Sequence, residues 1–320
     1  MRAVGRMEND ARLWAIILAG GSGRRMIPLT RAMHGGDVPK QFAVLSGNRS
    51  LLQATLDRVA GVVPAYRTVV VVTEELEAAA MRQLESTPGV EILVQPDDRG
   101  TAPALLLALA QIIQRDRCAR VVVLASDHHV SVPAPLLAAI EKGAWASQWN
   151  PEDIFSLGAV PDAIDQEYGW IVPGPSLRQP GLRAVVRIDA PASGVHRMPP
   201  GEPLWATSIV VATATSLWFL VARRFPAHAA VVERAASHGA SSSRVMVRRL
   251  REPYARLEAV DYDTALADAP AAQSLVTFAG SGWADLDTPR RVLQRMRNTP
   301  ELRRSLRRDM VAAAIERHTR

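Results

Sequence analysis

Short aliphatic and β-branched runs alternate with amphipathic stretches through the first half of the chain. The runs predict strands and the amphipathic stretches predict helices. One run, Thr68–Val72, has almost no polar alternation, as expected for a strand buried on both faces. The predicted strands are Leu13–Leu18, Thr68–Val72, Glu91–Val94, Arg120–Leu124 and Ile154–Val160. The predicted helices are Leu51–Val59, Glu74–Leu84, Thr101–Gln114 and Pro133–Trp149.

This alternation predicts a doubly wound α/β fold with a mostly parallel sheet, helices on both faces and right-handed crossovers. Beyond Pro161 the pattern loosens, and proline and glycine gather in Pro173–Gly181 and Pro191–Pro203. Strands are expected there at Arg183–Ile188, Ser208–Thr213 and Ser274–Phe278, and helices at Thr215–Arg224, Pro226–Ser237 and Pro289–Arg317. Residues 241–251 are expected to be a loop or the start of a helix.

The pattern divides the chain into a flexible lead at residues 1–11, an α/β domain at residues 12–289 and an Arg-rich C-terminal helical tail at residues 290–320. Of the 320 residues, 48% are hydrophobic and 22% are charged, which argues against a disordered chain. No apolar run approaches the roughly 20 residues of a membrane span, and no secretory signal is visible. We therefore expect a cytoplasmic protein without a membrane partner.

The net charge of +6 comes almost entirely from arginine, since the chain has only two lysines, Lys40 and Lys142. The excess gathers in Arg244–Arg256 and Arg290–Arg320, where solvated helix faces are the simplest interpretation. Nucleic acid is not an expected partner, because no zinc-finger spacing, RNA-binding aromatic pattern or Gly-Arg repeat accompanies the charge. The single cysteine, Cys118, excludes an internal disulfide and argues against a thiolate metal cluster.

A glycine-rich segment, Leu18-Ala-Gly-Gly-Ser-Gly-Arg-Arg25, directly follows the first predicted strand. Its glycines allow a sharp bend and a close approach to a ligand, and successive N–H groups can cradle phosphate. The segment is neither a P-loop nor the dinucleotide fingerprint, whose third glycine would fall on Met26. Alone it is equally consistent with a structural turn.

Two further segments carry candidate ligand-binding groups. Lys40, in Pro-Lys-Gln-Phe, can reach phosphates as a mobile charge, although a surface lysine is the alternative. The segment Gln95–Pro103 lies between a predicted strand and helix, where parallel sheets form a ligand crevice. There Gly100 permits close approach and Thr101 can cap the helix; a simple capping loop is the alternative.

Acidic residues occur at two points. Asp127, in Ser-Asp-His-His, follows a predicted strand and is well placed to hold Mg²⁺. The segment Gly282-Trp-Ala-Asp-Leu-Asp287 supplies Asp285 and Asp287, either of which could share a metal with Asp127. Each of these carboxylates could equally cap a helix or face solvent.

Taken in order, these segments resemble the sugar-1-phosphate nucleotidyltransferases, and most closely the single-domain bacterial branch of the mannose-1-phosphate guanylyltransferase group. The resemblance spans residues 13–293. It is carried by Leu18–Arg25, Pro39–Phe42, Ser50–Thr55, Asp98–Pro103, Ser126–His128, Tyr168–Ile171 and Gly282–Asp287.

The resemblance implies a Rossmann-like fold of the nucleotide-diphospho-sugar transferase type. Its nucleotide-binding part would be about residues 12–160 and its sugar-binding part about residues 161–289. The implied reaction is attack of mannose-1-phosphate on the α-phosphorus of GTP with Mg²⁺, giving GDP-mannose and diphosphate. The alternatives are another nucleoside triphosphate and sugar-1-phosphate pair, or a degenerate paralogue that binds nucleotide and regulates. A homo-oligomer is left open.

The resemblance also assigns roles to individual residues. Catalytic roles fall on Arg25 and Lys40, and the metal ligands on Asp127 and Asp285. Nucleotide-binding roles fall on Leu18, Ala19, Gly20, Gly21, Ser22, Gly23, Gln95, Gly100 and Thr101. Sugar-binding roles fall on Gly169, Asp189 and Thr207.

The sequence departs from the family pattern at four places. Ala190 stands in place of a lysine that grips the sugar phosphate, and Ala206 in place of an amide that binds the sugar. Asp287 replaces a glycine, and Arg24 replaces a threonine. The nucleotide half therefore matches the family more closely than the sugar half.

Overall fold

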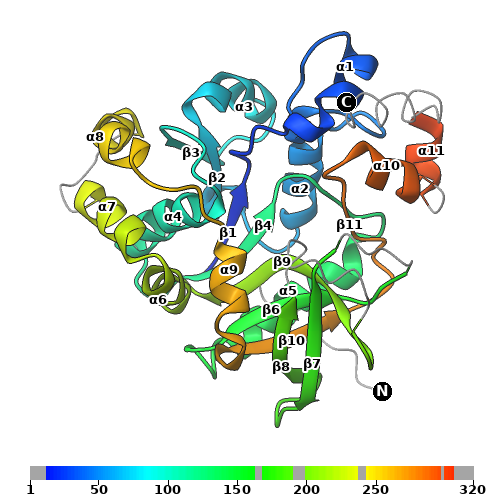
Figure 1. Cartoon of the computed structure of the whole chain (residues 1–320), viewed down its shortest axis with the longest axis vertical. Coiled ribbons are helices and arrows are strands. Elements are labelled where there is room, and N and C mark those ends of the chain that lie inside the picture. Colours follow the sequence, from blue (N-terminus) through cyan, green and yellow to red (C-terminus); the bar gives the residue numbers. More distant parts are fainter. Residues whose placement is uncertain (1–11, 163–167, 190–198, 237–242, 297–298, 306–320) are drawn as a thin grey trace.

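The computed structural model describes residues 12–162, 168–189, 199–236, 243–296 and 299–305 (Figure 1). The predicted lead at residues 1–11 and the last part of the predicted tail, residues 306–320, lie outside this range. A nine-stranded sheet in the order β3-β2-β1-β4-β9-β6-β10-β8-β7 forms the centre of the molecule. A separate two-stranded sheet pairs β11 with β5.

The strands of the large sheet are β1 (Leu13–Leu18), β2 (Thr68–Thr73), β3 (Glu91–Gln95), β4 (Arg120–Ala125), β6 (Ile154–Ala159), β7 (Trp170–Ser176), β8 (Leu182–Asp189), β9 (Leu204–Thr213) and β10 (Gln273–Phe278). The small sheet consists of β5 (His128–His129) and β11 (Ala284–Asp285). The helices are α1 (Ile27–His34), α2 (Leu51–Val59), α3 (Glu77–Leu84), α4 (Thr101–Arg115), α5 (Pro133–Ala146), α6 (Ala214–Arg224), α7 (Pro226–Ala236), α8 (Ser243–Ala255), α9 (Tyr262–Ala267), α10 (Pro289–Arg295) and α11 (Pro300–Ser305).

The large sheet is mixed, so the prediction of a mostly parallel sheet is wrong for its second half. The strands β3, β2, β1 and β4 run parallel, and so do β6 and β10. Strand β9 is antiparallel to both β4 and β6, and β8 is antiparallel to both β7 and β10. A hydrophobic run reveals a buried strand but not its direction, which explains the error.

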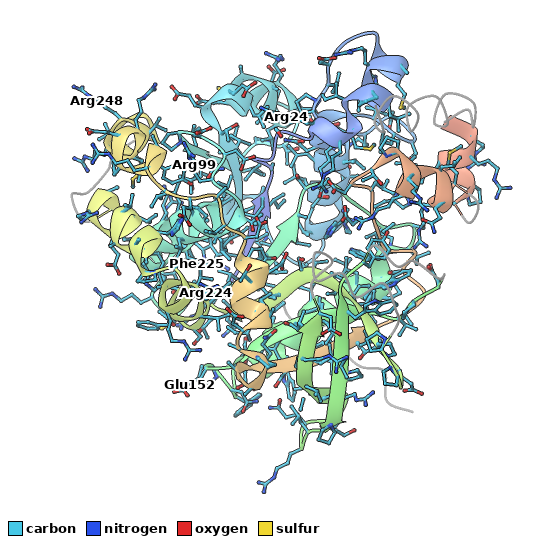
Figure 2. The ribbon with its side chains drawn as sticks, viewed as in Figure 1. Arg24, Arg99, Glu152, Arg224, Phe225 and Arg248 are labelled. Carbon is cyan, nitrogen blue, oxygen red and sulfur yellow. The ribbon has the colours of Figure 1, made fainter. Side chains whose placement is uncertain are left out.

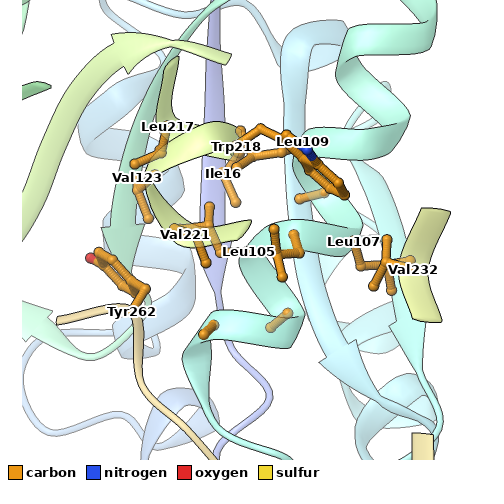
Figure 3. Packing of buried hydrophobic residues seen from close by; sticks show 14 of the residues in the cluster. Ile16, Leu105, Leu107, Leu109, Val123, Leu217, Trp218, Val221, Val232 and Tyr262 are labelled. Carbon is orange, nitrogen blue, oxygen red and sulfur yellow. The ribbon is translucent and has the colours of Figure 1, made fainter. Parts of the chain in front are cut away.

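Apolar side chains on the two faces of the sheet form two separate cores. On one face Ile16 of β1 packs with Leu105 of α4, Val221 of α6 and Val232 of α7 (Figure 3). On the other face its neighbour Ile17 belongs to the cluster that α2 and α5 cover. Each such buried aliphatic side chain contributes about 1.5–3 kcal/mol. Helices thus cover both faces, as the sequence predicts.

Several segments differ from their predicted form. Strand β7 includes Pro173 and Gly174, which made the sequence pattern typical of a loop. The segment predicted as a loop or a helix start begins α8 at Ser243. The predicted tail helix is divided into α10 and α11, because Thr299 is not helical and Pro300 opens the second helix. Within the described residues, no helix has the length and apolar character needed to cross a bilayer.

Candidate active site

The loops that follow β1, β2, β3 and β4 all emerge at one edge of the sheet, because these strands are parallel. A cleft of about 680 Å³ lies at this edge, between the glycine loop and the ends of β2 and β3. Figure 2 labels Arg24 on the loop after β1 and Arg99 on the loop after β3. The cleft is lined by Gly20, Ser22, Arg24, Ile27, Asp37, Pro39, Thr73, Glu75, Leu76, Pro96, Asp97 and Asp98.

The glycine loop is fixed by a side chain that sequence reasoning did not single out. Buried Gln41 donates from Nε2 to the carbonyl oxygens of Ala19 and Gly21, both at 2.9 Å. Gly23 has φ 61°, and a Cβ there would lie 2.9 Å from the backbone nitrogen of Lys40. The loop therefore needs glycine at this position, and its shape is coupled to the segment that carries Lys40.

Gln95 lies beside the glycine loop and is itself held in place. Its Oε1 accepts a hydrogen bond of 2.5 Å from the hydroxyl of Tyr254 in α8. A Cβ on Gly20 would lie 2.6 Å from its Nε2. Gln95 is buried, so the structure places it behind the loop as a packing partner of Gly20.

Gly100 and Thr101 lie against the segment before α9. Gly100 has φ 82°, and the backbone of Val260 fills the space that its side chain would need. The backbone N–H and the hydroxyl of Thr101 both donate to Asp261 Oδ1, at 3.0 and 2.9 Å. Neither Gly100 nor Thr101 lines the cleft. The structure thus assigns both residues contacts that hold the start of α4.

The end of β1 is tied to the same edge. The carbonyl of Leu18 accepts from the N–H of Ser126 at 3.1 Å, and the N–H of Ala19 donates to the carbonyl of Val71 at 2.8 Å. The glycine loop therefore begins beside the loop that carries Asp127.

The two predicted metal carboxylates are brought together by the small sheet. Strands β5 and β11 pair antiparallel, with Asp285 opposite His128. One ligand atom from each of Asp127, His128 and Asp285 lies within 4.8 Å of the others. The resemblance implied this meeting of Asp127 and Asp285, whereas the residues alone left Asp287 as an alternative and could not show the strand pairing that produces it.

Lys40 lies at the centre of this acidic cluster. Its Nζ forms ion pairs with Asp127 and with Asp287, and its side chain is 14% exposed. Asp287 also pairs with Arg25. The two predicted catalytic cations are therefore joined through Asp287, a residue that sequence reasoning noted only as an alternative metal ligand and as a substitution for glycine.

Burial and opposite charge act against each other on these groups. Burial alone would lower the pKa of Lys40, but the charges of Asp127, Asp285 and Asp287 raise it well above its usual value. Burial would raise the pKa of Asp127, yet Lys40 lowers it. Burial and the charge of Asp127 raise the pKa of Asp285 to about 6. Lys40 is thus a permanent cation, and the two carboxylates repel each other.

The donor atoms fit a hard divalent cation. Asp127 and Asp285 offer carboxylate oxygens, and a bound cation would relieve their repulsion. Burial lowers the pKa of His128 to about 4, so its ring is neutral. His128 Nδ1 accepts from Trp283 Nε1 at 3.3 Å, which places the ring proton on Nε2. The two carboxylates are therefore better ligands than the imidazole.

Arg291 of α10 is a further charged side chain that sequence reasoning missed. It is buried, donates to Asp285 Oδ2 at 2.5 Å and lies over the ring of Tyr168 at 4.6 Å. Thr288 accepts from the N–H of Arg291 and Pro289 occupies the first turn, which fixes the start of α10. The Thr-Pro pair was the available signal for this helix start.

A second cavity, of about 160 Å³, lies beside Asp285. Gly169 and Thr207 line it together with Tyr168, Ala206, Asp263 and Arg291. The hydroxyl of Thr207 is engaged with the carbonyl of Leu157 at 2.6 Å. Two of the three predicted sugar-binding residues therefore share one cavity.

Asp189, the third predicted sugar-binding residue, does not line that cavity. It ends β8 and accepts from Arg187 Nε at 2.9 Å. Its neighbour Ala190, one of the departures from the family pattern, lies outside the described residues.

Ser208 is the strained point of the cavity wall. Its φ of 56° places a non-glycine residue in the left-handed region. Two contacts hold it there: its Oγ donates to Asp263 at 2.9 Å, and its carbonyl accepts from the hydroxyl of Tyr262. A conformation that costs about 1–3 kcal/mol persists only where the surroundings fix it.

The fold and the site define an α/β protein whose ligand crevice lies at the carboxyl edge of the sheet. The model of one family, the nucleotidyl transferases, matches residues 14–189, which is more than half of the chain. The chain belongs to this family. The nucleotidyltransferase family to which the resemblance pointed is thereby confirmed.

Individual relatives point to the same group. The xanthan biosynthesis protein XanB of Xanthomonas campestris pv. campestris is 30% identical over 274 residues, which cover 85% of this chain and 56% of that protein. A mannose-1-phosphate guanylyltransferase of Escherichia coli is 32% identical over 203 residues, 60% of this chain and 41% of that protein. The chain thus spans about half the length of the curated relatives it matches.

A solved structure extends the similarity to most of the fold. The crystal structure of a mannose-1-phosphate geranyltransferase from Thermus thermophilus superposes with a TM-score of 0.74 at 27% identity. The match covers 90% of this chain and 80% of that one. It therefore extends well beyond the part that the family model describes.

Proposed function

We propose that this chain is a mannose-1-phosphate guanylyltransferase, which forms GDP-mannose and diphosphate from mannose-1-phosphate and GTP. The observation that carries the proposal is the position of Lys40, buried among carboxylates and next to the glycine loop. The name of the Escherichia coli relative supports the choice of nucleotide and sugar, and the name of the Thermus thermophilus structure supports the sugar.

The reaction needs no nucleophile from the protein. An oxygen of the sugar phosphate forms a bond to the α-phosphorus of the triphosphate, and the bond from that phosphorus to the departing diphosphate oxygen breaks. The leaving diphosphate takes the electron pair. The barrier is the repulsion between anions and their misalignment, so placement and charge neutralisation lower it.

The chain's own residues supply both the placement of the substrates and the neutralisation of their charge. In this proposal the backbone of Gly20–Gly23 cradles the triphosphate, and Lys40 and Arg25 neutralise its charge. Asp127 and Asp285 would hold Mg²⁺, which supplies further charge neutralisation when bound. The cleft beside Gly20 takes the nucleoside, and the smaller cavity beside Arg291 takes the sugar phosphate.

The residues of the small cavity support mannose less strongly than the glycine loop and Lys40 support a nucleotide. Ala206 lines the small cavity where the family has an amide, and Thr207 is already bonded to Leu157. These observations favour a second candidate function, in which the same chemistry uses another sugar-1-phosphate.

The test is release of diphosphate by the purified protein with Mg²⁺. GTP, ATP, UTP, CTP and dTTP are each combined with mannose-, glucose- and N-acetylglucosamine-1-phosphate. Release with GTP and mannose-1-phosphate alone supports the proposal, and release with another pair supports the second candidate. No release from any pair, despite measurable nucleotide binding, contradicts both and favours a regulatory paralogue.

A further inference from the structure

Arg58 of α2 is a buried cation outside the candidate active site. Its side chain is only 8% exposed. Its Nη2 donates to Thr55 Oγ1 at 2.7 Å and to the carbonyl oxygen of His128 at 3.2 Å. Both acceptors are neutral, and its Nε has no partner within the described residues. Burial lowers the pKa of Arg58 to about 10, so the guanidinium stays charged at neutral pH.

A buried charge without a counter-ion is costly, and most buried arginines are paired. No carboxylate among the described residues forms an ion pair with Arg58. The nearest candidate by sequence, Asp57, is engaged in two bonds to Arg49, at 2.7 and 2.5 Å. The positive charge of Arg58 therefore remains uncompensated within the described part of the chain.

Arg58 lines a cavity of about 420 Å³. The same wall carries Arg49, the hydroxyls of Ser46 and Ser131, and the ring of His129, whose Nε2 lies 3.1 Å from Ser131 Oγ. With Asp57 neutralising Arg49, the charged side chains of the wall sum to about one positive charge. Such a wall suits an anion with several oxygen acceptors.

The cavity is distinct from the candidate active site. Of the described residues, His128 alone lines both this cavity and the one beside Asp285. The glycine loop and Lys40 do not line it. The two regions nevertheless touch, because Arg58 holds His128 and Thr55 Oγ1 lies 3.4 Å from the carbonyl of Ser126. These contacts lie on either side of Asp127 in the chain.

We propose that this cavity is a second binding site, which takes a small phosphate-bearing anion with Arg58 as its main cation. The site is separate from the proposed transfer site and does not depend on the proposed function. An anion there supplies the counter-charge that Arg58 lacks, through the guanidinium and the neighbouring hydroxyls.

Ala54 gives a sharp test, because it lines the cavity and precedes Arg58 by four residues on α2. Side chains at i and i+4 of a helix meet, and an acid that precedes a base in this spacing pairs well. The substitution Ala54→Glu therefore supplies the missing carboxylate and leaves Arg58 in place. Ala54→Gln fills the same space without charge and is the matched control.

The probes are inorganic phosphate, diphosphate and a hexose-1-phosphate, each titrated calorimetrically without nucleoside triphosphate. We expect Ala54→Glu to weaken one class of anion binding about tenfold or more, about 1.4 kcal/mol, and Ala54→Gln to keep it. Bound anion should also raise the melting temperature of the wild type and of Ala54→Gln, but not that of Ala54→Glu. The probe that binds most tightly shows whether the cavity prefers free phosphate, diphosphate or a sugar-linked phosphate.

Anion binding at the transfer site is removed independently by Lys40→Gln. Anion binding in the Arg58 cavity should survive Lys40→Gln and disappear when Ala54→Glu is added. Equal anion affinity in the wild type, Ala54→Glu and Ala54→Gln would overturn the proposal, as would the absence of any anion binding that survives Lys40→Gln. Neither outcome depends on turnover, so failure of the proposed reaction remains distinguishable.

Discussion

Asp287 and Lys40 form an ion pair in which Asp287 Oδ1 lies 2.5 Å from Lys40 Nζ, while the other oxygen of Asp287 pairs with Arg25. One carboxylate therefore forms ion pairs with both of the cations that we propose to bind the triphosphate. Burial would raise the pKa of Asp287, but Lys40 lowers it below its usual value, so the carboxylate is charged at neutral pH. A nucleotide must displace this carboxylate or share its partners.

Asp287→Asn should tighten nucleotide binding. The amide keeps the shape of the side chain but loses the charge that competes with phosphate, so we expect the KM for the triphosphate to fall about three- to tenfold. Steady-state kinetics at fixed sugar phosphate measure this. The control is Asp268→Asn, which removes a similar pair with Arg224 at an exposed position outside the cleft. An unchanged or higher KM would show that Asp287 does not compete.

Lys40→Ala should lower turnover at least about 10²-fold, the scale of other lost electrostatic stabilisers. Asp127→Ala should have an effect of the same order, since it removes a proposed metal ligand. Lys142→Ala is a natural control, because Lys142 is the only other lysine and lies on α5. Diphosphate release gives the rate, and circular dichroism checks the fold. Near wild-type turnover in either variant would mean that the proposed site is misplaced.

Gly20→Ala and Gly21→Ala should differ sharply although they are adjacent. A Cβ on Gly20 would lie 2.6 Å from Gln95 Nε2, whereas a Cβ on Gly21 would meet nothing within 4 Å. Tyr254 holds Gln95 from behind, so it cannot withdraw freely. We expect Gly20→Ala to cost about 1–3 kcal/mol of unfolding free energy in urea titrations and Gly21→Ala about none. Equal stabilities would contradict the packing described for the loop.

Asp263 should make stability depend on pH. Burial raises its pKa to about 6, although the hydrogen bond from Ser208 lowers it. The folded state holds this proton more tightly than the unfolded chain does, so its contribution is complete at low pH and is lost as pH rises through about 6. Relative to Asp263→Asn, the wild type should therefore lose about 1–3 kcal/mol between pH 4 and pH 7.

Denaturant titrations of both proteins across that pH range test this expectation. Asp268→Asn serves as the control, since Asp268 is an exposed partner of Arg224. A constant difference between the wild type and Asp263→Asn at every pH would be inconsistent with a raised pKa.

The first half of the fold was predictable because its elements are local. Leu13–Leu18 and Leu51–Val59 have the predicted bounds in the structure, since continuous burial defines the strand and a Ser50–Gln53 capping box defines the helix start. Strand β7 was missed because Pro173 and Gly174 interrupt it. Proline is tolerated there because β7 pairs with β9 only at Trp170 and Ile171, so at Pro173 its one neighbour is β8.

Residues of the candidate site were predictable only where they lie within a short sequence motif. The motifs identified Lys40 and the carboxylates Asp127 and Asp285, and these do meet. Asp287 contacts Arg25 and Lys40, and Arg291 lies over the ring of Tyr168. These contacts join segments far apart in the chain, so no local pattern encodes them. Gly100 and Thr101 belong to a recognised motif, yet the contacts that the structure gives them are with Val260 and Asp261, so their nucleotide-binding role stays a prediction.

The pairing of β5 with β11 has a consequence for how the protein is made. Asp127 and its partner Asp285 are separated in the chain by β6 to β10, so Asp285 is synthesised much later. A polypeptide interrupted before Ala284 would already possess the glycine loop and Lys40 yet lack the second carboxylate. The proposed metal site is therefore complete only after β11 has been synthesised, and a shorter nascent chain lacks it.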